Sequence, residues 1–171
     1  IVNGKNTTKS LQATLKSNPE DVEALYRLGK KIFESGKTDE AAGYFKNAVE
    51  FDPKNKSGWV DDAELSLAQI NNKKEDIEAF VKKYPDSELT KIAVMYLAEL
   101  ALESNDYATG DNYYKQLIGK YGSNDEEINL GYGQYLLTKI YALNKKENKS
   151  KDDYRKGIEL ANECLNIVKG S

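Results

Sequence analysis

The stretch that decides the fold is LYRLGKKIFESGKTDEAAGYFKNAVEFDP, residues 25–53. Apolar residues recur in it at the three- and four-residue spacing of an amphipathic helix, on either side of the turn sequence Glu34-Ser35-Gly36-Lys37. Gly36 suits the left-handed position that ends a helix, and Pro53 cannot continue a second one. The stretch therefore predicts two antiparallel helices of about three to four turns that pack along facing apolar stripes.

Gly29 lies inside the first of these helices, where glycine costs about 0.5–1 kcal/mol relative to alanine. We expect close approach of the second helix to offset this cost, with Ala41 as the small residue opposite. Asn18 is predicted to cap the first helix, and Thr38 or Asp39 the second, because these side chains accept hydrogen bonds from the first free backbone N–H groups.

The order of these residues resembles the tetratricopeptide repeat (TPR), whose signature is W-x₂-L-G-x₂-Y, A-x₃-F and P over about 34 residues. The matching positions are Leu25, Leu28, Gly29, Ile32, Ala41, Phe45, Ala48 and Pro53. The resemblance implies an all-α fold, a TPR-like right-handed solenoid of about four antiparallel helix pairs. It also implies a protein–protein interaction scaffold that binds an extended or helical segment of a partner in its concave groove.

The resemblance covers most of the chain. Residues 1–19 are expected to form a loose N-terminus and a short lead-in helix, and residues 20–171 the helical repeat domain. The repeats are expected at about 20–55, 56–86, 87–123 and 124–169. Trp59 stands where the first repeat has its first leucine, and Ala63 and Ala98 stand where it has glycine. We expect these small residues to serve helix packing.

The last helix is predicted to run from about Asp152 to residue 168 as a solubilising cap, which stacked repeats require. In that interpretation Tyr154, Ile158 and Leu165 turn inward. Two glycines in the preceding helix, Gly131 and Gly133, are expected to permit close helix approach.

Two further resemblances concern the wider protein. The ending Tyr84-Pro85-Asp86-Ser87 is similar to helix ends in bacterial envelope TPR proteins, which favours a bacterial-type repeat. Residues 1–4, followed by Leu11 and Leu15, resemble the closing strand and terminal helix of a thioredoxin-like domain. The chain contains no Cys-x-x-Cys, so this resemblance implies no redox activity for it.

Composition argues against several classes of function. The net charge is −3 and no basic tract is present, so nucleic acid is a poor candidate partner. The most apolar stretch, residues 92–102, is interrupted by Glu99 and is too short to insert in a membrane. We therefore expect a soluble protein of the cytoplasm or the periplasm.

The sequence shows no catalytic or cofactor-binding pattern. It has no histidine, one cysteine, and no Gly-rich phosphate loop or nucleophile motif, so we expect no enzyme activity, no cofactor and no metal. Asp61, Asp62 and Glu64 form an acidic cluster that we interpret as a solvated helix face, because a divalent ion needs more converging oxygens.

The remaining candidate residues are those that a TPR register places on the concave groove, which the first helix of each pair lines. They are Tyr26, Arg27, Lys30, Phe33, Asp61, Glu64, Met95, Tyr96, Glu99, Leu102, Tyr132 and Tyr135. The chain has 12 tyrosines, and tyrosine is favoured at interfaces because it buries area and keeps a polar group. The alternative is that most of them are core aromatics.

Two other functions stay open. The chain could be the auxiliary domain of a larger enzyme, such as a thioredoxin-like oxidoreductase whose catalytic domain lies upstream of residue 1. It could also be a structural module that forms homo-oligomers. A Cys-x-x-Cys upstream would favour the first alternative, and concentration-dependent sedimentation tests the second.

Overall fold

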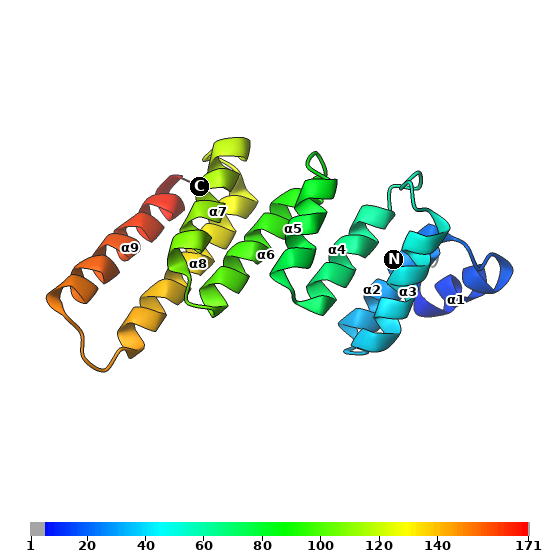
Figure 1. Cartoon of the computed structure of the whole chain (residues 1–171), viewed down its shortest axis with the longest axis horizontal. Helices are drawn as coiled ribbons and strands as arrows, with labels where there is room; N and C mark the ends of the chain where they lie inside the picture. The colour runs from blue at the N-terminus through cyan, green and yellow to red at the C-terminus, as the bar shows by residue number, and fades with distance from the viewer. Residues whose placement is uncertain (1–5, 171) are drawn as a thin grey trace. The chain divides into compact units, whose positions relative to one another are not determined.

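The helices of the computed structural model follow one another without any intervening sheet. The structure describes residues 6–170, and side chains as far as residue 167. Within residues 6–170 it contains α-helices, turns and loops but no strand, which confirms the all-α fold (Figure 1). The helices are α1 (Thr8–Ser17), α2 (Val22–Glu34), α3 (Thr38–Phe51), α4 (Val60–Asn71), α5 (Lys74–Lys83), α6 (Leu89–Glu103), α7 (Tyr107–Tyr121), α8 (Glu126–Lys145) and α9 (Lys151–Gly170). The strand expected at residues 1–4 lies outside the described residues.

The chain divides into two compact units, Ile1–Thr90 and Lys91–Ser171. The first unit holds α1 to α5, and the second holds α7, α8, α9 and all but the first two residues of α6. In the first unit α2 packs on α3 and also contacts α4, and α4 packs on α3 and α5. In the second unit α8 and α9 lie side by side as an antiparallel pair (Figure 1).

The start of α2 differs from the prediction. Its N-cap is Asp21, whose carboxylate accepts a hydrogen bond from the Ala24 N–H at 2.9 Å. Asn18 instead ends α1, where its backbone N–H donates to the Thr14 carbonyl at 2.8 Å. The prediction of Asn18 as the cap was wrong because both residues are good N-caps, and only the path of the chain out of α1 decides between them.

The turn between α2 and α3 has the predicted left-handed glycine. Gly36 has a φ of 84°, its N–H donates to the Phe33 carbonyl, and the Lys37 N–H donates to the Ile32 carbonyl. These two bonds form a Schellman motif, which satisfies carbonyls that the helix end leaves free. The N-cap of α3 is Lys37, so the prediction of Thr38 or Asp39 was wrong.

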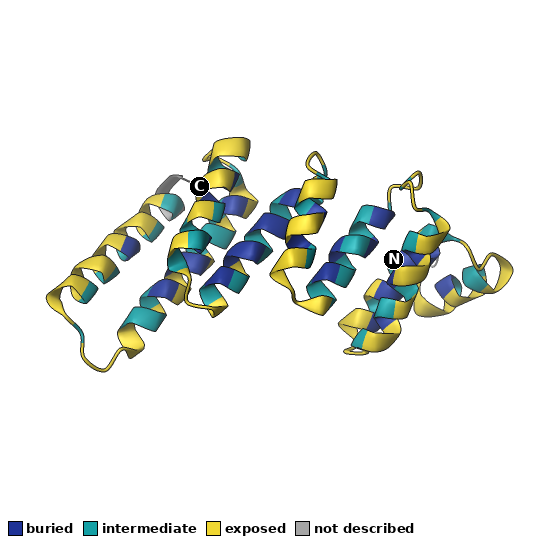
Figure 2. Ribbon diagram, viewed as in Figure 1, coloured by how far each residue is buried: buried dark blue, intermediate teal, exposed yellow. Residues whose placement is uncertain are grey.

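Gly29 is where α2 approaches α3 most tightly. An added Cβ would lie 2.8 Å from Phe45 Cε1 and 3.1 Å from Tyr44 Cβ. These side chains, and not Ala41 as predicted, come nearest to the glycine. The repeat positions around them are buried and form the core of the first unit (Figure 2), namely Leu25, Leu28, Ile32, Ala41, Phe45, Ala48 and Ala63. Trp59 is partly buried against this core, and Pro53 is exposed.

A tyrosine cluster, defined here as Tyr114, Tyr132 and Tyr135, organises the second unit. The ring centroids of Tyr114 lie 4.8 Å from Tyr132 and 5.1 Å from Tyr135. The Tyr135 hydroxyl donates to the Tyr107 carbonyl at 3.1 Å. Burial raises the pKa of all three hydroxyls well above the ordinary value, so these rings remain neutral at any physiological pH.

Next to this cluster the second unit contains an ion pair with a buried cation. Lys139 is 4% exposed, and its Nζ lies 2.6 Å from Asp111 Oδ1 and 5.2 Å from the centroid of the Tyr135 ring. A buried ammonium requires such partners, because an unpaired charge away from water is costly. The pair therefore joins α7 to α8.

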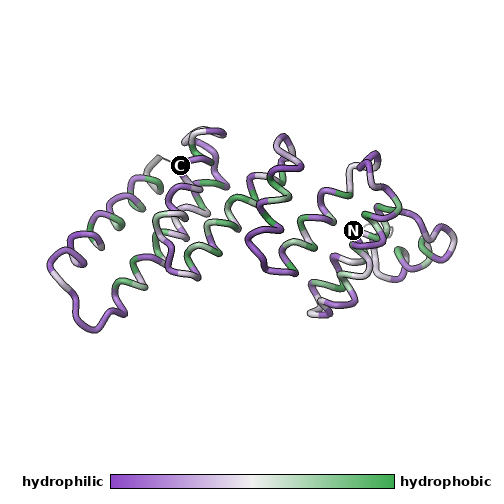
Figure 3. The backbone as a smooth tube through the Cα atoms, in the orientation of Figure 1, coloured by the Kyte–Doolittle hydropathy of each residue, from purple (hydrophilic) through white to green (hydrophobic). Residues whose placement is uncertain are grey.

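The last helix differs from the predicted cap. Tyr154, Ile158 and Leu165 are 60%, 63% and 54% exposed, so the prediction that they turn inward was wrong. The residues of α9 that are shielded include Leu160 and Cys164, and Figure 3 shows apolar and polar positions alternating along the helix. These three residues form an apolar stripe along α9, as the sequence predicts, but α8 packs against an adjacent face of the helix.

Candidate functional site

A surface cleft lies in the second unit between α6 and α8, with one residue of α7 in its lining. We call it the α6–α8 cleft, and its volume is about 540 Å³. Its lining combines apolar, aromatic and acidic side chains: Met95, Glu99, Leu102, Glu103, Tyr114, Glu127, Leu130, Gly131, Gln134, Tyr135 and Thr138. Four predicted groove residues, Met95, Glu99, Leu102 and Tyr135, thus meet in one cleft.

A glycine of the lining allows close approach of side chains from α6 and α7. A Cβ added at Gly131 would lie 3.0 Å from Met95 Sδ and 3.1 Å from the Tyr114 hydroxyl oxygen, so these side chains would have to shift to admit a larger residue. The expectation of close approach is confirmed for Gly131. It is wrong for Gly133, where an added Cβ would meet nothing within 4 Å.

The electrostatics of the cleft are one-sided. Its described lining contains three carboxylates and no basic side chain. Glu127 forms an ion pair, because Lys91 Nζ lies 2.6 Å from its carboxylate and 3.2 Å from that of Asp125. Glu99 and Glu103 have no ion-pair partner among the described residues. Desolvation raises the pKa of Glu99, and the charge of Glu103 raises it further.

Apolar surface continues from the cleft along α8. Leu130 is 74% exposed, and Leu137 and Tyr141 follow it at 55% and 61% exposure. Residues spaced by seven and eleven positions fall on one side of a helix, so these three side chains form an apolar strip that begins in the cleft. Sequence reasoning missed this strip and placed Tyr132 and Tyr135 on the groove face of α8.

The two tyrosines lie elsewhere. Tyr135 is 3% exposed and reaches the cleft only as part of its floor. The Tyr132 hydroxyl donates to a Glu163 carboxylate oxygen on α9, so this ring bridges the α8–α9 pair. The interpretation of both as groove-facing contacts is corrected: they are core aromatics, because the face of α8 that carries them packs on α7 and α9.

A smaller cleft of about 330 Å³ lies in the first unit between α2 and α4. Three predicted groove residues line it, namely Tyr26, Arg27 and Lys30, together with Trp59 and Asp62 among others. Tyr26 is 7% exposed and stacks on Trp59 with a centroid distance of 5.5 Å, which makes it a core residue rather than an exposed contact. The Arg27 guanidinium lies 4.7 Å from the centroid of Trp59.

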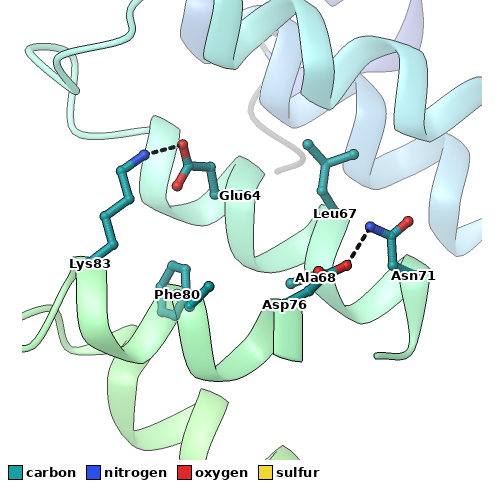
Figure 4. Close-up of a pocket in the computed structure, with 8 residues that line it drawn as sticks. Glu64, Leu67, Ala68, Asn71, Asp76, Phe80 and Lys83 are labelled. Carbon is teal, nitrogen blue, oxygen red and sulfur yellow. Dashed lines mark hydrogen bonds and ion pairs between the residues drawn. The ribbon is translucent and has the colours of Figure 1, made fainter. Parts of the chain in front are cut away.

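Two acidic residues of α4 form an ion pair or hydrogen bonds within the first unit. Figure 4 shows Lys83 of α5 reaching Glu64 across a pocket, with the Lys83 Nζ donating at 2.5 Å. Asp61 accepts hydrogen bonds from Asn55 Nδ2 at 3.0 Å and from Ser87 Oγ at 2.9 Å. Asp61 therefore ties together the loops on either side of the α4–α5 pair, and its role is structural. The sequence interpretation of a wholly solvated face is corrected for both residues.

Two other predicted groove residues, Phe33 and Tyr96, line neither of these two clefts. Phe33 is 43% exposed on α2, and Tyr96 is half-buried on α6. Desolvation raises the pKa of Tyr96, with contributions from the charges of Glu103 and Glu99, which places its hydroxyl in the same acidic field as the α6–α8 cleft.

Two searches of the described residues bear on other classes of site. Among residues 6–170 no helix combines the length and apolarity that a membrane span requires. Over the same range, no three side chains of the metal-binding types gather closely enough to hold a metal ion.

Comparisons with known proteins agree with this architecture. Residues 9–56 match the sequence model of the family described as tetratricopeptide repeat. The whole fold is similar to a solved structure titled "Crystal structure of MamA", at 17% sequence identity and a TM-score of 0.63. That similarity covers 95% of this chain and 86% of the other. A search of curated proteins finds no match to this sequence.

Residues 9–56 thus carry a tetratricopeptide-repeat segment, which holds α2, α3 and all of α1 except Thr8, and the chain as a whole shares the fold of the MamA structure. This confirms the resemblance that the Leu25–Pro53 pattern carries.

Proposed function

We propose that this protein is a binding scaffold that takes up a segment of a partner protein in the α6–α8 cleft. The observation that carries the proposal is the composition of that cleft. Apolar side chains form its floor, and Leu130 stands 74% exposed at its edge. An exposed leucine beside a concave apolar surface is a typical anchor point for a partner, because burying a leucine contributes about 1.5–3 kcal/mol.

The fold supports the same class of function. Helical repeats present extended surfaces formed by successive first helices, and α6 and α8 are the first helices of their pairs. The described lining contains neither histidine nor cysteine, and its apolar side chains favour the binding of a partner segment.

The test is selection of peptides from a random library displayed on phage, with the full chain as bait. Selected peptides are then bound to the variants Leu130→Asp and Ile158→Asp. Ile158 is a matched control, because it is an apolar residue of α9 with 63% exposure that does not line the cleft. We expect binding to fall at least tenfold in Leu130→Asp and to stay unchanged in Ile158→Asp. Equal loss in both, or no selected peptide, would refute the proposal.

A further inference from the structure

The α6–α8 cleft combines apolar side chains with uncompensated negative charge. Its apolar residues include Met95 and Leu102 of α6 and Leu130 of α8. Glu99 and Glu103 of α6 lie four residues apart and therefore on one side of that helix. A ligand in the cleft would meet both the apolar side chains and the two carboxylates.

The two glutamates cost the fold some stability. Like charges at this spacing on a helix repel each other, and loss of water together with the charge of Glu103 raises the pKa of Glu99. Neither carboxylate is neutralised by a described basic side chain, whereas Glu127 in the same lining is paired with Lys91. Two carboxylates of the cleft, Glu99 and Glu103, therefore have no counter-charge within the described part of the unit.

From this complementarity we infer that the occupant of the cleft is a basic amphipathic helix of a partner protein, with an apolar stripe flanked by lysine or arginine. The inference rests on the proposed function and names the partner's chemistry. Its apolar stripe would lie on Met95, Leu102 and Leu130, and its basic flank along Glu99 and Glu103.

The dimensions of the apolar lining on α6 suit a helix. Met95 to Leu102 spans seven helical steps, or about 10 Å at 1.5 Å per residue. A partner helix of about three turns covers that length and presents side chains at the same repeat. Basic residues four apart on its flank would recur at the spacing of the two glutamates, since both helices have the same pitch.

The test uses three synthetic helical peptides of about 15 residues with an identical leucine stripe and flanking positions of lysine, glutamine or glutamate. Each carries a fluorophore, and binding to the full chain is followed by fluorescence anisotropy. We expect the lysine peptide to bind at least tenfold more tightly than the glutamine peptide, and the glutamate peptide to bind most weakly. Higher salt should reduce the difference, because the rim charges are screened.

Two pairs of substitutions distinguish binding by the cleft carboxylates from attraction by the net negative charge of the protein. Glu99→Gln with Glu103→Gln should remove most of the preference for the lysine peptide. The control pair, Glu147→Gln with Glu159→Gln, makes the same change in net charge at exposed residues outside the lining, and should leave the preference intact. Equal loss of the preference in both pairs would mean attraction by net charge alone, and would overturn the inference.

The outcomes distinguish the two claims. Equal binding of the lysine and glutamine peptides, lost in Leu130→Asp, would leave a helix-binding cleft but refute its preference for basic partners. Binding of none of the three peptides overturns the inference, and the library selection then decides separately whether the cleft binds any segment at all.

Discussion

Gly29 offers the sharpest test of how the first helix pair is packed. A Cβ at this position would lie 2.8 Å from Phe45 Cε1, where ordinary carbon contacts are about 3.5–4.0 Å, so α2 and α3 must separate by about 0.7 Å or the ring must move. Phe45 is 0% exposed, so a shift of its ring disturbs the core around it. We therefore expect Gly29→Ala to incur an overpacking cost of about 1–3 kcal/mol.

Alanine also has a higher helix propensity, and a control is needed to separate the two effects. Gly43 lies inside α3 of the same pair, and an added Cβ there meets nothing within 4 Å. Gly43→Ala should therefore gain about 0.5–1 kcal/mol from propensity alone. Subtracting that gain leaves Gly29→Ala less stable than wild type by up to about 2.5 kcal/mol, and less stable than Gly43→Ala by about 1–3 kcal/mol.

The assay is urea unfolding followed by far-ultraviolet circular dichroism. Both substitutions lie in one helix pair of the first unit, so both report on the same transition even if the two units unfold separately. Equal stabilisation by Gly29→Ala and Gly43→Ala would refute the close approach of α2 and α3 on which the TPR register depends.

Three further predictions concern the second unit. Gly110→Ala should destabilise it by about 1–3 kcal/mol in thermal unfolding, because the new Cβ would lie 2.8 Å from the Tyr135 ring, and an unchanged melting temperature would contradict that packing. Asp111→Asn should cost about 1–3 kcal/mol in urea unfolding, because it leaves the Lys139 ammonium buried without its counter-charge, whereas adding Lys139→Met should recover part of the loss. In a spectrophotometric alkaline titration the tyrosine cluster should ionise only above the ordinary tyrosine pKa of 10.0. Its raised folded pKa stabilises the unit fully below that pH, and this stabilisation is lost as the pH rises further, so titration of all 12 tyrosines in one step with the fold intact would contradict the burial.

Part of the candidate site could be read from the sequence. Met95, Glu99 and Leu102 recur along a helix whose pattern is clear, and in the structure all three line one surface cleft. On α8 the same reasoning failed. That helix has apolar residues on several faces, including Ile128 toward the core and Leu130 toward solvent, and periodicity alone does not say which face another helix covers.

The prediction that Tyr26 and Tyr135 contact a partner failed for a related reason. Tyr26 and Tyr135 are amphipathic side chains, and the sequence cannot show whether such a ring is needed to fill a core or is free for a partner. In the structure both are nearly fully buried among other aromatic rings. The alternative that these tyrosines are core aromatics holds at both positions.

The local pattern by itself determined the helices, their turns and the repeat class. Leu25, Leu28, Phe45 and Gly36 act within one helix pair, and their spacing, size and backbone freedom are properties of the chain that need no distant partner. Tertiary structure alone decided which faces are covered. It buried Tyr135, left Leu130 exposed, and set two glutamates unpaired beside it, because burial and charge compensation depend on which helices meet, and residues far apart in sequence settle that.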